Sequence, residues 1–270
     1  AARRLEQALQ DAAPVAVAVS GGVDSMTLAS FAHRLLGSSA VLAVHAASPA
    51  VPAEATARVR DEAARAGWQL QVIDAGEFAD PAYRANPVNR CFFCKTNLYG
   101  SITAETSWQV VSGANTDDLG EYRPGLDAAR NHGVRHPFVE AGYSKSAVRD
   151  LARTLGLRDI AELPSAPCLS SRIETGIRVE PEVLAFVHHT ERLVADRLGT
   201  APGSQRSVRC RVRAGGIVVE LDPASLARFD DADRAALGRL IEAAAPKRLS
   251  GRPIGFAPYR VGSAFLVPGA

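Results

Sequence analysis

Short β-branched runs alternate with longer helical patterns through the first half of the chain, and this alternation most constrains the fold. The strands are expected at 14–20, 40–47, 68–76 and 108–115, and the helices at 25–37, 52–67, 94–106 and 144–157. Strands separated by crossover helices build a mostly parallel sheet with helices on both faces. The sequence therefore predicts an α/β fold around a parallel sheet.

The pattern changes after a segment rich in Pro, Ser and Gly at 164–181. A helix at 183–199, a strand pair within 207–222 and a helix at 232–246 are expected beyond it. This order of elements is typical of a smaller α+β domain. We therefore predict two domains, residues 1–170 and residues 171–270.

The charge and the apolar pattern limit the classes of partner. Among 270 residues, 31 are basic and 29 acidic, so no strong field favours a nucleic-acid or membrane partner. Apolar runs are too short to span a bilayer, and the amphipathic start lacks the apolar stretch of a signal peptide. We expect a cytoplasmic protein, in which the four cysteines are thiols, metal ligands or catalytic groups rather than disulfides.

The string SGGVDS follows the first predicted strand and opens a helix. Gly21 and Gly22 allow the backbone to approach a phosphate, and Ser20 and Ser25 add hydroxyl donors beside the helix amides. Asp24 fits such a cradle if Mg²⁺ joins it to the phosphates. The string lacks the ending of a Walker loop and the third glycine of a dinucleotide fingerprint. A plain glycine turn is the alternative.

A second polar block, SGANTDDLGEYRPG, follows the strand expected at 108–115. Gly113 lies where open parallel sheets bind ligands, beyond the carboxyl end of a strand. Asn115 and Asp117 offer polar groups to a substrate, and Arg123 offers a guanidinium to a phosphate or to Glu121. A solvated turn that favours Asn and Asp is the alternative.

SGGVDS resembles the PP-loop of the ATP pyrophosphatase superfamily. This resemblance implies a Rossmann-like PP-loop domain that binds ATP at residues 20–25. It also implies that ATP is cleaved between its α and β phosphates and that a substrate is adenylated.

The second block and the later string PSAPCLSSRI resemble the LarE family more specifically. Members are ATP-dependent sulfur transferases that convert pyridinium-3,5-biscarboxylic acid mononucleotide to a dithiocarboxylate for the nickel-pincer cofactor of lactate racemase. The resemblance implies a small-molecule nucleotide substrate, a homo-oligomer, and no nucleic-acid or membrane partner. It places Arg172, within CLSSR, at the substrate, and it leaves the sulfur donor open.

Cys91 and Cys94 have the spacing of a metal-ligand pair, a redox dithiol or two unrelated thiols. A structural zinc site normally takes a fourth Cys or His, and Cys210 is expected to pack inside the small domain. One LarE branch gives up the sulfur of the cysteine that corresponds to Cys168. Another branch holds a 4Fe–4S cluster on three cysteines, which correspond to Cys91, Cys94 and Cys168, with an extra sulfide on the open iron. We expect cluster ligands here, with sacrificial transfer from Cys168 as the main rival.

Arg209, Arg211 and Arg213 alternate on a predicted strand, so their guanidiniums share one face. Such like charges need a phosphate or carboxylates between them, unless they line a solvated edge. The LarE resemblance implies that Arg209 and Arg211 bind the substrate phosphate. It also matches Glu191 to a glutamate linked to a divalent metal, whereas Arg213–Ala214–Gly215 departs from the family's His–Gly–Asp.

Two other functions remain open from the sequence. A tRNA-thiolating enzyme would share the PP-loop but should add a basic RNA-binding surface. A non-catalytic nucleotide or iron–sulfur carrier would bind ATP without turnover.

Overall fold

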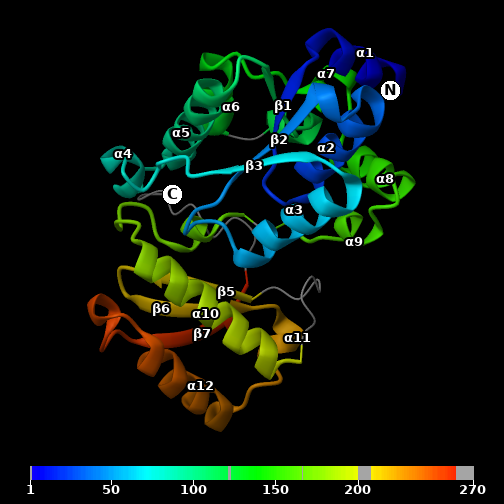
Figure 1. The fold of residues 1–270 in the computed structure, drawn as a ribbon. Helices are drawn as coiled ribbons and strands as arrows, with labels where there is room; N and C mark the ends of the chain where they lie inside the picture. The colour runs from blue at the N-terminus through cyan, green and yellow to red at the C-terminus, as the bar shows by residue number, and fades with distance from the viewer. Residues whose placement is uncertain (1, 121–122, 166, 200–207, 260–270) are drawn as a thin grey trace. The chain divides into compact units, whose positions relative to one another are not determined.

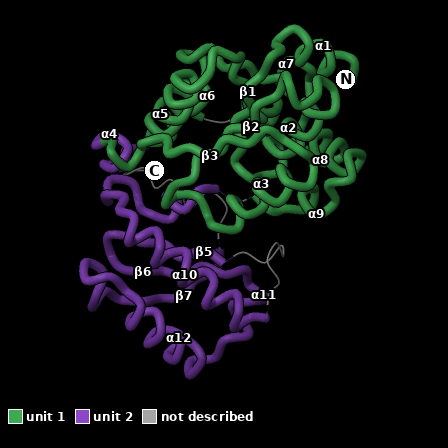
Figure 2. The backbone as a smooth tube through the Cα atoms, in the orientation of Figure 1, with its two compact units in different colours: residues 1–80, 89–166 green, residues 81–88, 167–270 purple. Residues whose placement is uncertain are grey.

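The computed structural model describes residues 2–120, 123–165, 167–199 and 208–259. The chain divides into two compact units, shown in different colours in Figure 2. Unit 1 contains residues 1–80 and 89–166, and unit 2 contains residues 81–88 and 167–270. Residues 81–88 interrupt unit 1 in sequence but belong to unit 2.

A four-stranded parallel sheet forms the centre of unit 1, with strand order β3-β2-β1-β4. The strands are β1 (Val15–Ala18), β2 (Val41–Ala46), β3 (Gln69–Ile73) and β4 (Gln109–Ser112). Val15 is paired with Val41 on one side and Gln109 on the other. The predicted Rossmann-like α/β fold is confirmed.

Helices cover both faces of this sheet (Figure 1). They are α1 (Ala2–Ala12), α2 (Val23–Leu36), α3 (Ala53–Ala66), α5 (Arg90–Glu105), α6 (Pro124–Asn131), α7 (Pro137–Ala141), α8 (Lys145–Thr154) and α9 (Arg158–Ala161). Successive strand residues point to opposite faces. Val17 therefore packs in the core with Leu28 of α2, whereas Ala16 packs in a second core with Ile102 of α5.

Local signals explain several helix ends. The Ser144 side chain accepts a hydrogen bond from the backbone N–H of Ala147, so it caps α8 as its residue type predicts. Gly67 ends α3 in the left-handed conformation, with φ of 70°. α5 begins at Arg90, four residues before the sequence indicated. The Cys-x-x-Cys pair thus lies within a helix and not on the loop before it.

Unit 2 is built on a three-stranded sheet with strand order β5-β6-β7. Its strands are β5 (Val208–Arg213), β6 (Gly216–Leu221) and β7 (Ile254–Pro258). β5 is antiparallel to β6, whereas β7 is parallel to β6. Its helices are α4 (Pro81–Arg84), α10 (Pro181–Arg197), α11 (Pro223–Leu226) and α12 (Asp231–Ala244). Short 3₁₀ turns are η3 (Leu169–Arg172) and η4 (Lys247–Leu249).

Buried hydrogen bonds hold residues 81–88 in unit 2. The fully buried Asn86 has a positive φ of 55°, and its side-chain amide donates to the carbonyls of Ile173, Glu174 and Ile177. The Tyr83 hydroxyl lies 2.7 Å from the Ser170 hydroxyl. These bonds connect the segment to the chain around η3.

Within the ranges listed above, no helix combines the length and apolar character needed to cross a membrane.

Candidate functional site

The glycine turn, residues 20–25, lies between β1 and α2. Gly21 has φ of 81°, and a Cβ there would lie 2.6 Å from the Ala55 carbonyl oxygen, so only glycine fits without strain. Arg58 Nη1 donates to the Gly21 carbonyl at 2.7 Å. The Ser25 hydroxyl oxygen lies 3.0 Å from the Ser20 amide and 3.1 Å from the Ser20 hydroxyl. The hydrogen bond from Arg58 and the contacts between the two serines thus hold the turn in place.

Helix α2 starts at this turn with Gly22 as its N-cap, and among the described residues no side chain caps it. The first amides of a helix and its dipole attract anions. The two serine hydroxyls stand beside them. This arrangement suits a phosphate group.

Asp24, in the first turn of α2, has two partners from distant segments. Its Oδ2 is ion-paired with Lys145 Nζ, and its Oδ1 accepts from the Asn115 side-chain amide at 3.2 Å. Asn115 is only 2% exposed. The sequence places Lys145 in the first turn of the helix expected at 144–157, where a surface residue is expected, whereas the fold brings its side chain to the glycine turn.

Gly113 brings the end of β4 against the first turn of α2. A Cβ at Gly113 would lie 2.8 Å from the Asp24 carbonyl carbon and 2.8 Å from the Ser25 nitrogen. Such distances are shorter than side-chain carbons tolerate. Gly113 is therefore needed for the close approach of two backbone segments at the carboxyl edge of the sheet.

The loop after Gly113 is organised by its own polar groups. Asp118 Oδ2 accepts from the Asn115 backbone N–H at 3.0 Å, and Asn115 Oδ1 accepts from the Asp117 N–H at 3.0 Å. Asp117 also accepts from the Lys145 N–H at 3.3 Å. Arg123 is paired with Asp118 at 3.0 Å. Glu121, the other carboxylate considered for Arg123, lies outside the described residues.

The three cysteines of interest are half-buried thiols outside any disulfide. Cys91 and Cys94 lie three residues apart at the start of α5, so they share one helix face. Cys168 is the N-cap of η3 and belongs to unit 2. In the part of the chain that the structure describes, no three His, Cys, Asp or Glu side chains are gathered as a metal site. Thiolates are the soft ligands that iron–sulfur clusters use, so the donor type fits.

Cys210 differs from these three. It is completely buried on β5, which confirms that it packs inside the small unit. Burial raises the pKa of its thiol far above the ordinary value.

Arg172 holds the turn that carries Cys168. Its Nε and Nη2 donate to both carboxylate oxygens of Glu191, at 2.9 and 3.1 Å. Its Nη1 donates to the carbonyls of Pro167 and Cys168, at 2.6 and 3.2 Å. Arg172 is 4% exposed. Its guanidinium thus connects Glu191 to the backbone at Cys168, and neighbouring Glu191 raises its pKa against the opposing effect of burial.

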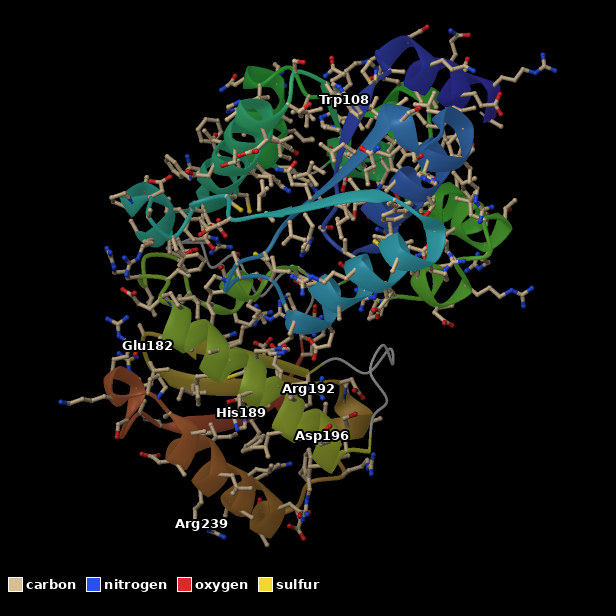
Figure 3. All side chains as sticks on the ribbon, viewed as in Figure 1. Trp108, Glu182, His189, Arg192, Asp196 and Arg239 are labelled. Carbon is tan, nitrogen blue, oxygen red and sulfur yellow. The ribbon has the colours of Figure 1, made fainter. Side chains whose placement is uncertain are left out.

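Glu191 lies on α10 and also accepts from the Cys210 backbone N–H at 3.0 Å. Other polar residues of this helix, His189, Arg192 and Asp196 among them, lie on its exposed side (Figure 3). Glu191 therefore faces η3 and β5, where its carboxylate contacts Arg172.

Glu220 of β6 lies among the alternating arginines of β5. Its carboxylate accepts from Arg211 Nε at 3.1 Å and from Arg213 Nη2 at 2.6 Å. Arg211 also donates to the Ser171 carbonyl at 2.8 Å. The carboxylate that the arginine pattern requires is thus supplied from the neighbouring strand.

Arg209 is half-buried and lies 5.9 Å from the centre of the Tyr259 ring. Burial lowers the pKa of its guanidinium, and the nearby positive charge of Arg172 lowers it further. An anion at Arg209 would relieve that repulsion.

An open parallel sheet with a glycine turn, a lysine and a polar loop at its carboxyl edge defines a Rossmann-like α/β protein. No family model matches the chain. The uncharacterized protein slr1717 of Synechocystis sp. is 36% identical over 84% of this chain and 82% of its own length. The pyridinium-3,5-bisthiocarboxylic acid mononucleotide synthase of Lactiplantibacillus plantarum is 31% identical over 70% of this chain and 69% of its own. The chain belongs to the family of this synthase, the LarE family.

A third relative, the uncharacterized protein MJ0830 of Methanocaldococcus jannaschii, is 26% identical over 67% of this chain and 69% of its own length.

Proposed function

We propose that this protein is an ATP-dependent sulfur transferase that converts carboxylates of pyridinium-3,5-biscarboxylic acid mononucleotide to thiocarboxylates. The observation that carries the proposal is family membership through a synthase of the bisthiocarboxylic acid mononucleotide. The geometry of the glycine turn supports the ATP-dependent part. From the same family membership we infer that the product serves the nickel-pincer cofactor of lactate racemase.

The first step is adenylation of a substrate carboxylate. ATP binds with its phosphates at the glycine turn, where Ser20, Ser25 and the first amides of α2 donate to phosphate oxygens. A carboxylate oxygen attacks the α-phosphorus, the bond from that phosphorus to the bridging oxygen breaks, and pyrophosphate leaves. Asp24 would hold Mg²⁺, and Lys145, released from Asp24, would neutralise developing negative charge.

The second step replaces AMP on the activated carbonyl by sulfur. Cys91, Cys94 and Cys168 would hold a 4Fe–4S cluster, which supplies a transferable sulfide when bound. In the alternative, Cys168 itself gives up its sulfur. Either way, the hydrogen bonds from Arg172 to the Pro167 and Cys168 carbonyls fix the turn that carries this thiol.

In unit 2, Arg209 would bind the substrate phosphate. Arg211 stays beside it as part of the Glu220 pair and would orient that surface. Glu191 would bind a divalent metal only after its carboxylate leaves Arg172.

The test of adenylation is release of pyrophosphate and AMP from ATP on addition of the biscarboxylic acid mononucleotide. The wild-type protein should release both products, and Asp24→Asn should release neither while still folding. ATP binding without turnover would contradict the proposal and favour a carrier.

The test of the sulfur source is anaerobic purification followed by iron and sulfide analysis. A cluster predicts about four irons per chain that are lost in Cys91→Ala. An iron-free wild type with a sulfur-sized mass loss at Cys168 after turnover would instead establish sacrificial transfer.

A further inference from the structure

His136 lies at the carboxyl edge of the unit 1 sheet, beside the glycine turn region. The backbone at Arg135 forms an isolated parallel bridge with Val111 of β4, so this single residue pairs with the sheet beside β4. His136 follows that bridge directly and is the N-cap of α7. The His136 side chain therefore starts at the carboxyl edge of the sheet, where open parallel sheets bind ligands.

The two ring nitrogens of His136 differ in their hydrogen bonds to the described residues. Nδ1 lies 2.8 Å from the hydroxyl oxygen of Ser112, the last residue of β4. In the described part of the chain, no hydrogen bond reaches Nε2. When the Ser112 hydroxyl donates to Nδ1, the ring proton resides on Nε2, which then offers a donor.

Ser112 also fixes where this donor lies. The next residue, Gly113, contacts the first turn of α2 so closely that a Cβ would lie 2.8 Å from the Ser25 nitrogen. Ser112 is itself 9% exposed. The Ser112–His136 pair is therefore one residue away from the contact between β4 and the turn that we propose binds ATP.

Burial of the ring favours a neutral imidazole at neutral pH. Burial is the largest influence and lowers the pKa of His136. Glu140 of α7 and Asp118 of η2 (Thr116–Gly120) raise the pKa, and Lys95 of α5 lowers it. A neutral ring carries one proton, which lies on Nε2 when the Ser112 hydroxyl donates to Nδ1, and it donates without adding a fixed charge.

We propose that His136 is a substrate-binding residue whose Nε2–H donates to an anionic oxygen of a bound substrate, with Ser112 fixing the ring. This inference rests on the proposed function, because that function supplies the two sources of anionic oxygen: the ATP phosphates and the substrate carboxylates. The sequence did not single out His136 for this role.

The test uses the whole 270-residue chain labelled with ¹⁵N at its six histidines. The signals of His136 are assigned from their loss in His136→Gln. Two probes are added separately, Mg²⁺ with α,β-methylene-ATP and pyridine-3,5-dicarboxylate. The Nε2 signal of His136 should move with one of them, and the responding probe identifies the phosphate or the carboxylate as the source.

Two variants separate the ring nitrogens. His136→Asn places a polar atom near the Nδ1 position and loses the reach of Nε2, so the affinity for the responding probe should fall about tenfold. His136→Gln extends to the Nε2 position and should bind within about threefold of wild type. His33→Asn is the matched control, because its ring contacts the Gly67 carbonyl at the other end of α2.

The outcomes also separate this inference from the function it rests on. If the wild type binds a probe but the His136 signals stay still and His136→Asn binds normally, only the role of His136 is overturned. If the wild type binds neither probe, the proposed function and this inference both fail.

Discussion

Lys145 and Asp24 form an ion pair that joins the first turn of α8 to the first turn of α2 across 121 residues of sequence. The pair is partly exposed, at 34% for Lys145 and 26% for Asp24. Surface pairs of this kind contribute about 0–1 kcal/mol to stability. This small contribution and the position of the pair beside the glycine turn indicate a role in ligand binding rather than in stability.

Lys145→Met should lower pyrophosphate release about tenfold to a hundredfold, because one cation that stabilises charge in the transition state is lost. The urea midpoint should change little. The measurement is ATP-dependent pyrophosphate release beside a urea titration. Arg130→Met is the control, because it removes a more exposed ion pair, with Asp127, on α6. Equal turnover in Lys145→Met and wild type would refute the catalytic role of Lys145.

Gly113→Ala should destabilise unit 1 by about 1–3 kcal/mol, because its methyl group would overlap the backbone of Asp24 and Ser25. ATP binding should weaken with it. Gly120→Ala is the matched control in the same loop, where a Cβ meets no atom of the described residues within 4 Å. Urea titration and nucleotide affinity measure both effects. Equal urea midpoints and equal nucleotide affinities in the two alanine variants would contradict the close backbone approach at Gly113.

Removing either partner of the Arg172–Glu191 pair should destabilise unit 2 by about 3–5 kcal/mol, because an unpaired charge stays buried. Arg172→Met and Glu191→Gln are the variants, measured by urea unfolding. Arg197→Met, which breaks an exposed pair with Asp233, should cost less than about 1 kcal/mol. A small effect in both buried-pair variants would mean that water reaches this guanidinium.

Thiol labelling of the metal-free, folded protein should distinguish Cys210 from the others. Cys91, Cys94 and Cys168 are half-buried and should react, whereas Cys210 is fully buried and burial raises its pKa, so thiolate is scarce. Intact mass after brief iodoacetamide treatment should show three additions, and a fourth only in urea. A native chain that takes four additions at once would contradict the burial of Cys210.

Stability should fall as the pH drops below the ordinary histidine value of 6.5, because burial lowers the pKa of His45. Its Nδ1 donates to the Val19 carbonyl at 2.8 Å, and its Nε2 lies 2.9 Å from the Thr56 hydroxyl. The unfolded chain then binds the proton more readily than the folded one, so full stability is present above 6.5 and is lost toward the lower folded pKa.

The measurement for this prediction is the urea midpoint at pH 7.5 and at pH 5.5. His45→Gln should flatten the dependence, although the buried hydrogen bonds it loses cost about 1–3 kcal/mol at either pH. An equally steep slope in His45→Gln would assign the pH dependence to other groups, of which His136 is the first candidate.

The sequence by itself determined the parallel sheet and the glycine turn, because both follow from local patterns. Short β-branched runs separated by helical patterns predicted the strands, and the adjacent glycines at 21 and 22 predicted the turn. The burial of Cys210 also followed from its place in an alternating strand.

Only the tertiary structure decided which distant polar groups meet. Lys145 reaches Asp24, Ser112 meets His136, and Glu220 lies among the arginines of β5 through cross-strand register. Residues 81–88 join unit 2 through the buried amide of Asn86. Such pairings depend on packing between segments far apart in sequence, whereas propensity and period report only on neighbours within a few residues.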